Sequence, residues 1–159
     1  MGLDASLECV VSLSLDNDEN LRLRESIKNL FGPFIMLGNA KAGGTFTGFI
    51  PVSVNFEVMS WRKAHDIHNW FVKNIQDGKD KDCGRRYSLD ASKLHELLMV
   101  VNKIVESYET IPKEDQEYLS REITLTRETK EGLEKLLTWY EALPKTIQLH
   151  VWFSYQATW

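Results

Sequence analysis

Residues that would mark this sequence as a member of a specialised class are scarce. Only two cysteines and four prolines occur among 159 residues. Cys9 and Cys83 lie far apart, which fits a reduced cytoplasmic protein better than a disulfide framework. No apolar run is long enough to cross a bilayer, so we expect no membrane span. Basic residues are not in excess either, because the net charge is −4, and this argues against binding nucleic acid through a basic surface.

The composition that is present is that of an ordinary soluble domain. Hydrophobic residues make up 43% of the chain and charged residues 26%, and both values are typical of globular proteins. We therefore expect a single domain spanning residues 1–159, which is long enough to bury a substantial core.

Both ends of the chain alternate between apolar and polar residues. In Met1–Leu15 and in Ile147–Trp159 the apolar side chains recur at every second position. A period of two predicts a strand that is buried on one face. We expect the odd-numbered side chains of both strands to lie in the core, and we expect the two strands to pair in one sheet.

Three longer segments have the apolar spacing of helices. The first is expected at Trp61–Gln76 with Ser60 as its N-cap. The second begins after Asp90, and the third begins at Thr126 and ends at Pro144. The side chains expected to be buried are Leu94, Leu97, Leu98, Val101, Ile104, Val105 and Tyr108 in the second helix, and Leu133, Leu136, Leu137, Tyr140 and Leu143 in the third.

Shorter elements are expected between the first strand and the first main helix. Residues 16–31 have a short helical stripe, and residues 34–37, 46–50 and 52–58 have the pattern of strands. The strands lie at the ends of the chain and ahead of the helices, so they do not form a βαβ series. We therefore expect an α+β fold, in which a mostly antiparallel sheet that includes the N- and C-terminal strands packs against about three main helices.

The stretch Ser60–Tyr87 combines aromatic, basic, imidazole and thiol side chains more densely than any other part of the chain. We take it as the candidate binding site and assign no catalytic residue. The candidate residues are Trp61, Arg62, Lys63, His68, Trp70, Cys83, Arg85, Arg86 and Tyr87. His68 has two interpretations: a core histidine with satisfied ring nitrogens, or a functional imidazole that faces Cys83 or a ligand.

Three motifs fall short of metal or cofactor sites. His65 and His68 form an HxxH pair, but with Cys83 they supply only three plausible ligands, whereas a structural zinc site needs four. Lysines interrupt the acidic loop at residues 77–82, so it does not match a calcium loop. The glycine-rich segment at residues 38–45 lacks the lysine of a phosphate-binding loop and leads into a predicted strand. We therefore expect neither a metal nor a cofactor.

The central stretch also carries a resemblance to a known family. The matching residues are Trp61-Arg62-Lys63-Ala64, Ile67-His68, Trp70-Phe71-Val72, Cys83-Gly84 and Tyr87, together with the opening Met1-Gly2-Leu3-Asp4. This pattern resembles a family of small bacteriophage and prophage proteins that have an MGLD start and a WRKAN-x-IH-x-WFV helix. His65 stands where that family usually has Asn, and the aromatic segment that the family has before its last helix is absent here.

The resemblance implies a phage accessory protein that acts in the host cytoplasm. Together with the acidic charge and the lack of a recognisable catalytic arrangement, it favours a non-enzymatic binding protein whose partner is a host protein or an anti-phage defence component. The alternative is a protein or enzyme that binds a nucleotide or another phosphorylated small molecule. In that case the basic residues of the stretch contact the anion and Trp61 or Trp70 stacks on the ligand. The sequence leaves the oligomeric state open.

Overall fold

The structure, a computed structural model, describes residues 3–13, 52–80, 84–112, 116 and 119–158. The elements predicted at residues 16–31, 34–37 and 46–50 lie outside the described residues. The same holds for Met1, Cys83 and Trp159.

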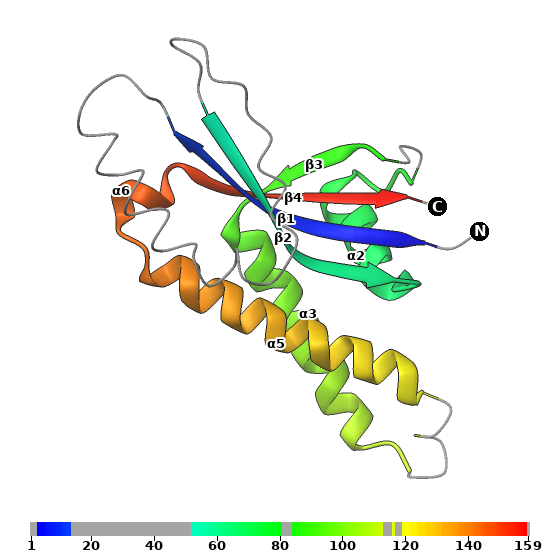
Figure 1. The fold of residues 1–159 in the computed structure, drawn as a ribbon. Coiled ribbons are helices and arrows are strands. Elements are labelled where there is room, and N and C mark those ends of the chain that lie inside the picture. Colours follow the sequence, from blue (N-terminus) through cyan, green and yellow to red (C-terminus); the bar gives the residue numbers. More distant parts are fainter. Residues whose placement is uncertain (1–2, 14–51, 81–83, 113–115, 117–118, 159) are drawn as a thin grey trace.

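The described strands form one antiparallel sheet in the order β2-β1-β4-β3. They are β1 (Asp4–Leu13), β2 (Val52–Arg62), β3 (Arg86–Leu89) and β4 (Val151–Thr158). β1 and β4 are the central pair, with Asp4 opposite Thr158. The predicted pairing of the first and last strands is therefore confirmed (Figure 1).

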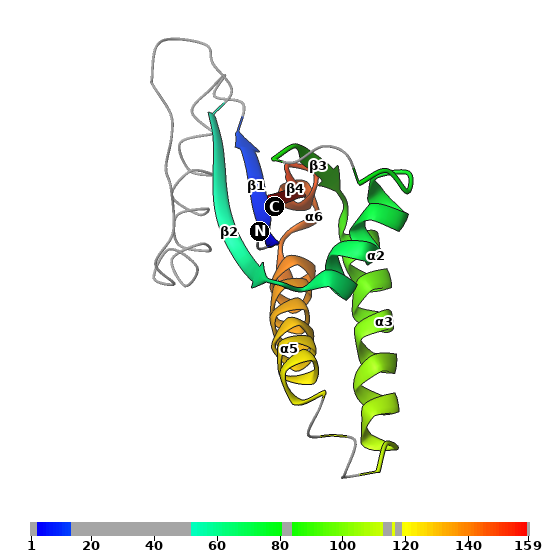
Figure 2. The same ribbon diagram turned by 90° about the vertical axis from the view of Figure 1, so that its right-hand side faces the viewer.

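The long helices lie on one face of this sheet, which we call the inner face (Figures 1 and 2). The described helices are α2 (His65–Ile75), α3 (Ala91–Glu109), α5 (Ser120–Ala142) and the short α6 (Lys145–Gln148). α3 and α5 pack against each other as a hairpin, and both views show this hairpin extending well past the sheet. The fold is the expected α+β arrangement with about three main helices.

The predicted core positions of the two terminal strands are confirmed with one exception: Leu149 is 84% exposed, because it ends α6 and precedes the last strand. Their buried odd-numbered side chains are Leu3, Ala5, Leu7, Cys9, Val11, Val151, Phe153, Tyr155 and Ala157. They join one hydrophobic cluster with Leu94, Leu97, Val101, Leu133, Leu136 and Leu137 of the hairpin. Cys9 serves as a packing residue, because burial raises the pKa of its thiol to about 12 and a protonated thiol is a poor nucleophile.

The start of the first main helix was predicted wrongly. Ser60, Trp61 and Arg62 belong to β2 rather than to a helix. α2 begins at His65, and its N-cap residue Ala64 makes no side-chain cap bond. The sharp turn from β2 into α2 is made by Lys63, whose φ is 61° and whose backbone N–H donates to the Leu3 carbonyl at 2.7 Å.

A β-bulge explains why Trp61 points inward from a strand. The register between β1 and β2 shifts after Leu7 and leaves Val58 without an opposite residue. An extra residue changes the phase of the alternation along a strand. Phe56 before the bulge and Trp61 after it therefore both reach the core. Trp61 also lies at helical spacing from Ala64, and this spacing made the sequence look helical.

Three further predictions are corrected by the structure. The last long helix begins at Ser120, and Thr126 lies inside it rather than at its cap. Ile147 belongs to α6, so the last strand begins at Val151. Ile104 is 41% exposed, although its spacing along α3 predicts burial.

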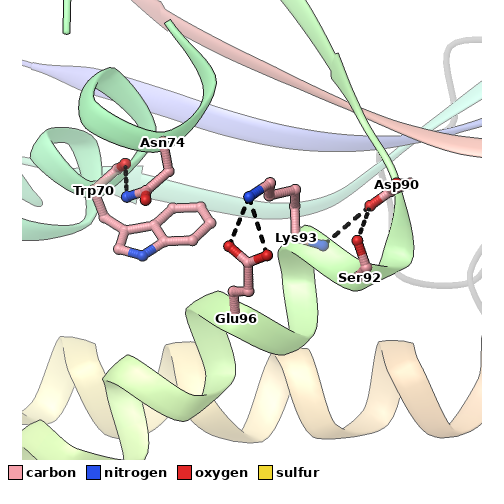
Figure 3. A network of polar contacts seen from close by, with 6 residues as sticks. All are labelled: Trp70, Asn74, Asp90, Ser92, Lys93 and Glu96. Carbon is pink, nitrogen blue, oxygen red and sulfur yellow. Dashed lines mark hydrogen bonds and ion pairs between the residues drawn. The ribbon is translucent and has the colours of Figure 1, made fainter. Parts of the chain in front are cut away.

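The predicted cap of α3 is confirmed. The Asp90 carboxylate accepts from the Lys93 backbone N–H at 3.1 Å, and Lys93 Nζ lies 2.7 Å from a carboxylate oxygen of Glu96. Figure 3 shows this first part of α3 together with α2, where the Asn74 amide donates to the Trp70 carbonyl at 2.7 Å. Trp70 packs against the edge of the core cluster.

Candidate functional site

His68 connects α2 to the sheet through both of its ring nitrogens. Its Nδ1 lies 2.6 Å from the Tyr155 hydroxyl, and its Nε2 lies 3.1 Å from a carboxylate oxygen of Asp80. Tyr155 is fully buried in β4, and its ring stacks on Phe71 of α2 with centroids 3.7 Å apart. This arrangement matches the first interpretation of His68, a core histidine with a partner at each nitrogen.

The electrostatics of this group favour one set of proton positions. Burial, and to a smaller extent the Asp80 carboxylate, raises the pKa of Tyr155 above its usual value, so the phenol stays neutral. A neutral phenol can donate its O–H to Nδ1 of His68. In a neutral imidazole the proton then resides on Nε2, which faces the acceptor Asp80.

This group is better suited to structure than to reaction chemistry. His68 is only 4% exposed, whereas the Asp80 side chain at the other end is 46% exposed. Neither the phenol nor the imidazole presents a reactive atom to solvent. The three residues instead tie the chain that follows α2 to the central strand β4.

Two of the predicted basic residues lie on the face of the sheet opposite the helices, which we call the outer face. Arg62 Nε lies 3.8 Å from an Asp4 carboxylate oxygen, and Arg86 donates to Glu8 at 3.0 Å. Asp4 and Arg62 are opposite each other in the register of β1 and β2, whereas Arg86 of β3 is opposite Gln156 of β4 and reaches across β4 to Glu8 of β1. Each arginine therefore has a carboxylate beside it.

A shallow depression of about 480 Å³ lies on this outer face. It is lined by Asp4, Ala5, Ser6, Glu57, Ser60, Trp61, Arg62, Gln156 and Thr158. Its charged lining residues are two carboxylates and one guanidinium, so an anion gains little there. The depression is the part of the molecule that an uncharged or mixed-charge small ligand would contact.

The remaining predicted site residues are distributed over other surroundings. The Trp61 indole N–H donates to the Thr129 hydroxyl of α5 at 2.8 Å, inside the core. Trp70 is half-buried and meets Phe71 edge to face. The Arg85 guanidinium lies 5.4 Å from the centre of the Tyr87 ring.

The predicted set therefore does not form one concave surface. His68, Trp61 and Trp70 pack on the inner face, while Arg62 and Arg86 lie on the outer face. Cys83 lies outside the described residues. One contiguous stretch of sequence is divided between two sides of the sheet because it forms a strand, a helix and a second strand in turn.

The described part of the chain has neither a cluster of metal ligands nor a helix that could span a membrane. Within residues 3–13, 52–80, 84–112, 116 and 119–158, no group of three or more His, Cys, Asp and Glu residues could hold a metal ion. His65 is exposed whereas His68 is buried, so the two do not face a common point. Among the helices described, none is both long and apolar enough to span a membrane.

The structure reveals an apolar groove on the half of the α3–α5 hairpin that lies away from the sheet. We call this part of the hairpin, residues 100–111 and 119–126, the distal hairpin. The groove has a volume of about 410 Å³. It is lined by Asp66, Val100, Lys103, Ile104, Ser107, Tyr108, Ile111, Leu119, Glu122, Ile123 and Thr126. About half of these side chains are apolar, and apart from Asp66 of α2 they come from α3, α5 and the residues next to the facing ends of these two helices, which lie side by side (Figure 2).

Large apolar side chains are exposed along this groove. The exposed fractions are 37% for Val100, 41% for Ile104 and 40% for Leu119. The sequence contains a pattern that indicates the groove: Val100 and Ile104 are four residues apart and lie beside the buried apolar stripe of α3. This second apolar stripe is hard to recognise from the sequence, because the spacing of Ile104 also fits the buried face of α3.

Comparisons of the chain with protein-family models, with curated proteins and with solved structures found no match. The resemblance to the phage family therefore stays a prediction that rests on the quoted motif.

Proposed function

We propose that this protein is a non-enzymatic accessory protein of a phage that binds a host protein or an anti-phage defence protein in the host cytoplasm. The observation that carries the protein-binding part is the apolar groove of the distal hairpin. The phage context is supported only by the sequence motif described above.

Exposed apolar side chains gathered in a groove support binding of another protein. Single exposed apolar residues are common on soluble proteins, but contiguous ones mark interaction surfaces. Val100, Ile104 and Leu119 line the same groove and are each more than a third exposed. Complete burial of a side chain of this size stabilises a complex by roughly 1.5–3 kcal/mol before the costs of association.

The burial of the reactive groups supports a role without catalysis. His68 and Tyr155 are withdrawn from solvent, and the thiol of Cys9 keeps its proton at neutral pH. A catalytic acid, base or nucleophile must reach its substrate within hydrogen-bond distance. These three side chains are already engaged in packing or in the contacts between α2 and the sheet.

A small ligand on the outer face is the second candidate function. The observation that favours it is the depression of about 480 Å³, where the Ser60 hydroxyl and the Arg62 guanidinium are donors. Asp4 and Glu57 line the same depression, so their carboxylates repel a phosphate group. A phosphorylated ligand is therefore less well supported here than a neutral one.

The proposal is tested by capture from a bacterial host lysate with three tagged proteins: wild type, Ile104→Glu and Leu149→Glu. Ile104 lines the groove, whereas Leu149 follows α6 and is 84% exposed, so the second variant controls for adding a charge at an exposed apolar site. We expect a protein partner to be retained by wild type and by Leu149→Glu and to be lost from Ile104→Glu.

Native mass spectrometry of the captured material separates the two candidate functions. The outer-face ligand would be favoured if a small molecule is retained by wild type and lost from Arg62→Ala, and if no protein is captured through the groove. A partner that Ile104→Glu still captures at wild-type level would contradict protein binding through the groove.

A further inference from the structure

The groove of the distal hairpin has charged residues on more than one side. Lys103 comes from α3 and Glu122 comes from α5. Asp66, from the first turn of α2, lines the groove as well. The apolar side chains of Ile104 and Ile123 line the same groove. A ligand that fills the groove must therefore combine an apolar face with charges along its flanks.

These three charged side chains carry both signs, and the carboxylates outnumber the ammonium group by two to one. No ion pair between described residues involves Asp66, Lys103 or Glu122. The groove thus offers two carboxylates and one ammonium group to whatever binds there. The net charge of the whole chain, −4, has the same sign, so the approach of a positively charged partner is favoured at long range.

The shape of the groove suits a helix. Two helices packed side by side leave a furrow between them, and side chains of a third helix can fill it as ridges fill grooves. An amphipathic helix presents its apolar side chains at positions i, i+3 or i+4, and i+7 along one face. Its flanking residues can then meet the charged side chains of the lining, which are Asp66, Lys103 and Glu122.

We propose that the groove of the distal hairpin binds an amphipathic helix with basic flanking residues, contributed by the protein partner. This inference rests on the proposed function. The apolar side chains of the helix cover Val100, Ile104 and Leu119, and its Lys or Arg residues pair with Asp66 and Glu122. Complementary charges of this kind fix the orientation of the bound helix and speed its association.

The test is selection from two displayed peptide libraries against the full chain. One library holds amphipathic peptides of about 16 residues, long enough to form a helix, with apolar positions fixed and flanking positions varied among Lys, Glu and Gln. The other holds the same residues with proline in the middle. We expect helical peptides with Lys at the flanks to be selected, and we expect the selected peptide to bind Ile104→Glu at least about tenfold more weakly, a loss of about 1.4 kcal/mol.

Reversing the charges sharpens the test. In a variant that combines Asp66→Lys and Glu122→Lys, the selected basic peptide should lose affinity and Glu-flanked peptides should be preferred. Groove-dependent peptides that are acidic or contain the central proline would overturn the basic helix while leaving protein binding in place. Peptides that bind Ile104→Glu as well as wild type would overturn both proposals, and the failure of both libraries to yield any peptide would overturn the basic helix.

Discussion

Two regions of the molecule, the part around the sheet and the distal hairpin, are formed by the same two helices, α3 and α5. They differ in how far their apolar side chains are buried. Over the sheet, Leu94, Leu97 and Leu133 are completely or almost completely buried. At the distal hairpin, Val100 and Ile104 remain substantially exposed on the same helix α3. The sheet completes the core in the first region, whereas the distal hairpin extends past the sheet (Figure 1) and its groove is open at Val100, Ile104 and Leu119.

Charged side chains show the same contrast. Over the sheet, Lys93 pairs with Glu96 at 2.7 Å and His95 lies 3.1 Å from Glu141, whereas the charges that line the groove have no such partners among the described residues. Exposed pairs contribute little to stability, so this difference between the two regions should have little effect on the fold. Together with the exposed apolar side chains, it is the contrast on which the proposed binding of a partner to the distal hairpin rests.

The largest predicted effect compares a leucine inside α5 with the leucine at the N-cap of that helix. Leu133→Ala removes a fully buried side chain and should lower the free energy of unfolding by about 2–5 kcal/mol, because it leaves a cavity in the core. Leu119→Ala, at the exposed groove, should lower it by less than about 1 kcal/mol. Chemical denaturation of both variants measures the difference, and equal losses would show that the distal hairpin is as well packed as the core.

The next effect concerns the contact between α2 and the sheet. Tyr155→Phe removes the hydroxyl that lies 2.6 Å from Nδ1 of His68 and should cost about 1–3 kcal/mol, because a buried nitrogen loses its partner. Tyr108→Phe is the control on the distal hairpin, where the hydroxyl donates to the Gln116 carbonyl and is only partly buried. We expect a loss of no more than about 1.5 kcal/mol there.

The raised pKa of Tyr155 also predicts that the protein loses stability at alkaline pH. The pKa of Tyr155 is raised in the folded protein, so its contribution is fully present below the unfolded pKa of about 10. It is lost as the pH rises above that value towards the folded pKa, because only the unfolded chain then releases the proton. Unfolding curves between neutral and alkaline pH should show this loss in wild type and in Tyr108→Phe. A Tyr155→Phe variant with the same loss would contradict the assignment.

A smaller effect is expected from two neighbouring valines on α3. Val101→Ala removes two methyl groups from the core and should cost about 1.5 kcal/mol, at about 0.8 kcal/mol for each buried carbon. Val100→Ala, one residue earlier and 37% exposed, should change stability by no more than about 0.5 kcal/mol. Thermal unfolding of the pair gives the comparison at nearly the same point of the helix, and similar values would remove the distinction between the two faces of α3.

The smallest predicted effect compares the starts of the two hairpin helices. Asp90→Ala should cost about 1 kcal/mol because α3 loses its N-cap, whereas α5 has no side-chain cap at Leu119 to lose. The Ser92 hydroxyl, and then the Lys93 N–H, lowers the pKa of Asp90. Its contribution is therefore present above the unfolded pKa and is lost as the pH falls through the lower folded value. Asp90→Asn should keep most of the cap and lose this acid dependence, which unfolding curves below neutral pH can check.

The sequence predicted the elements whose side chains alternate or repeat on one face. The terminal strands were found because each buries one face, and so period two is visible from Leu3 onward and in Val151–Ala157. The start of the first main helix was missed because the bulge at Val58 changes the phase of β2, and no local pattern marks a bulge. The strand β3 has four residues, of which only Leu89 is buried, and this is too short to show a period.

The candidate site was only partly predictable for a different reason. His68 and Tyr155 are 87 positions apart, and a single sequence does not reveal which distant side chains meet. Arg62 and Arg86 were expected beside the aromatic residues, but the pleat of the strands sends them to the opposite face. The groove depends on the exact packing angle between α3 and α5, and apolar spacing alone does not distinguish Ile104 from a core residue.

The strand order β2-β1-β4-β3 also has a consequence for the order in which the chain folds. The Thr158 hydroxyl donates to the Asp4 carbonyl at a separation of 154 positions, and closing so long a loop slows folding. The α3–α5 hairpin needs only contacts between segments that are close in sequence, and such contacts form early. During synthesis we therefore expect the hairpin to assemble before β4 is available to complete the sheet. A nascent chain would then display its groove to a partner or a chaperone while its own core was still open.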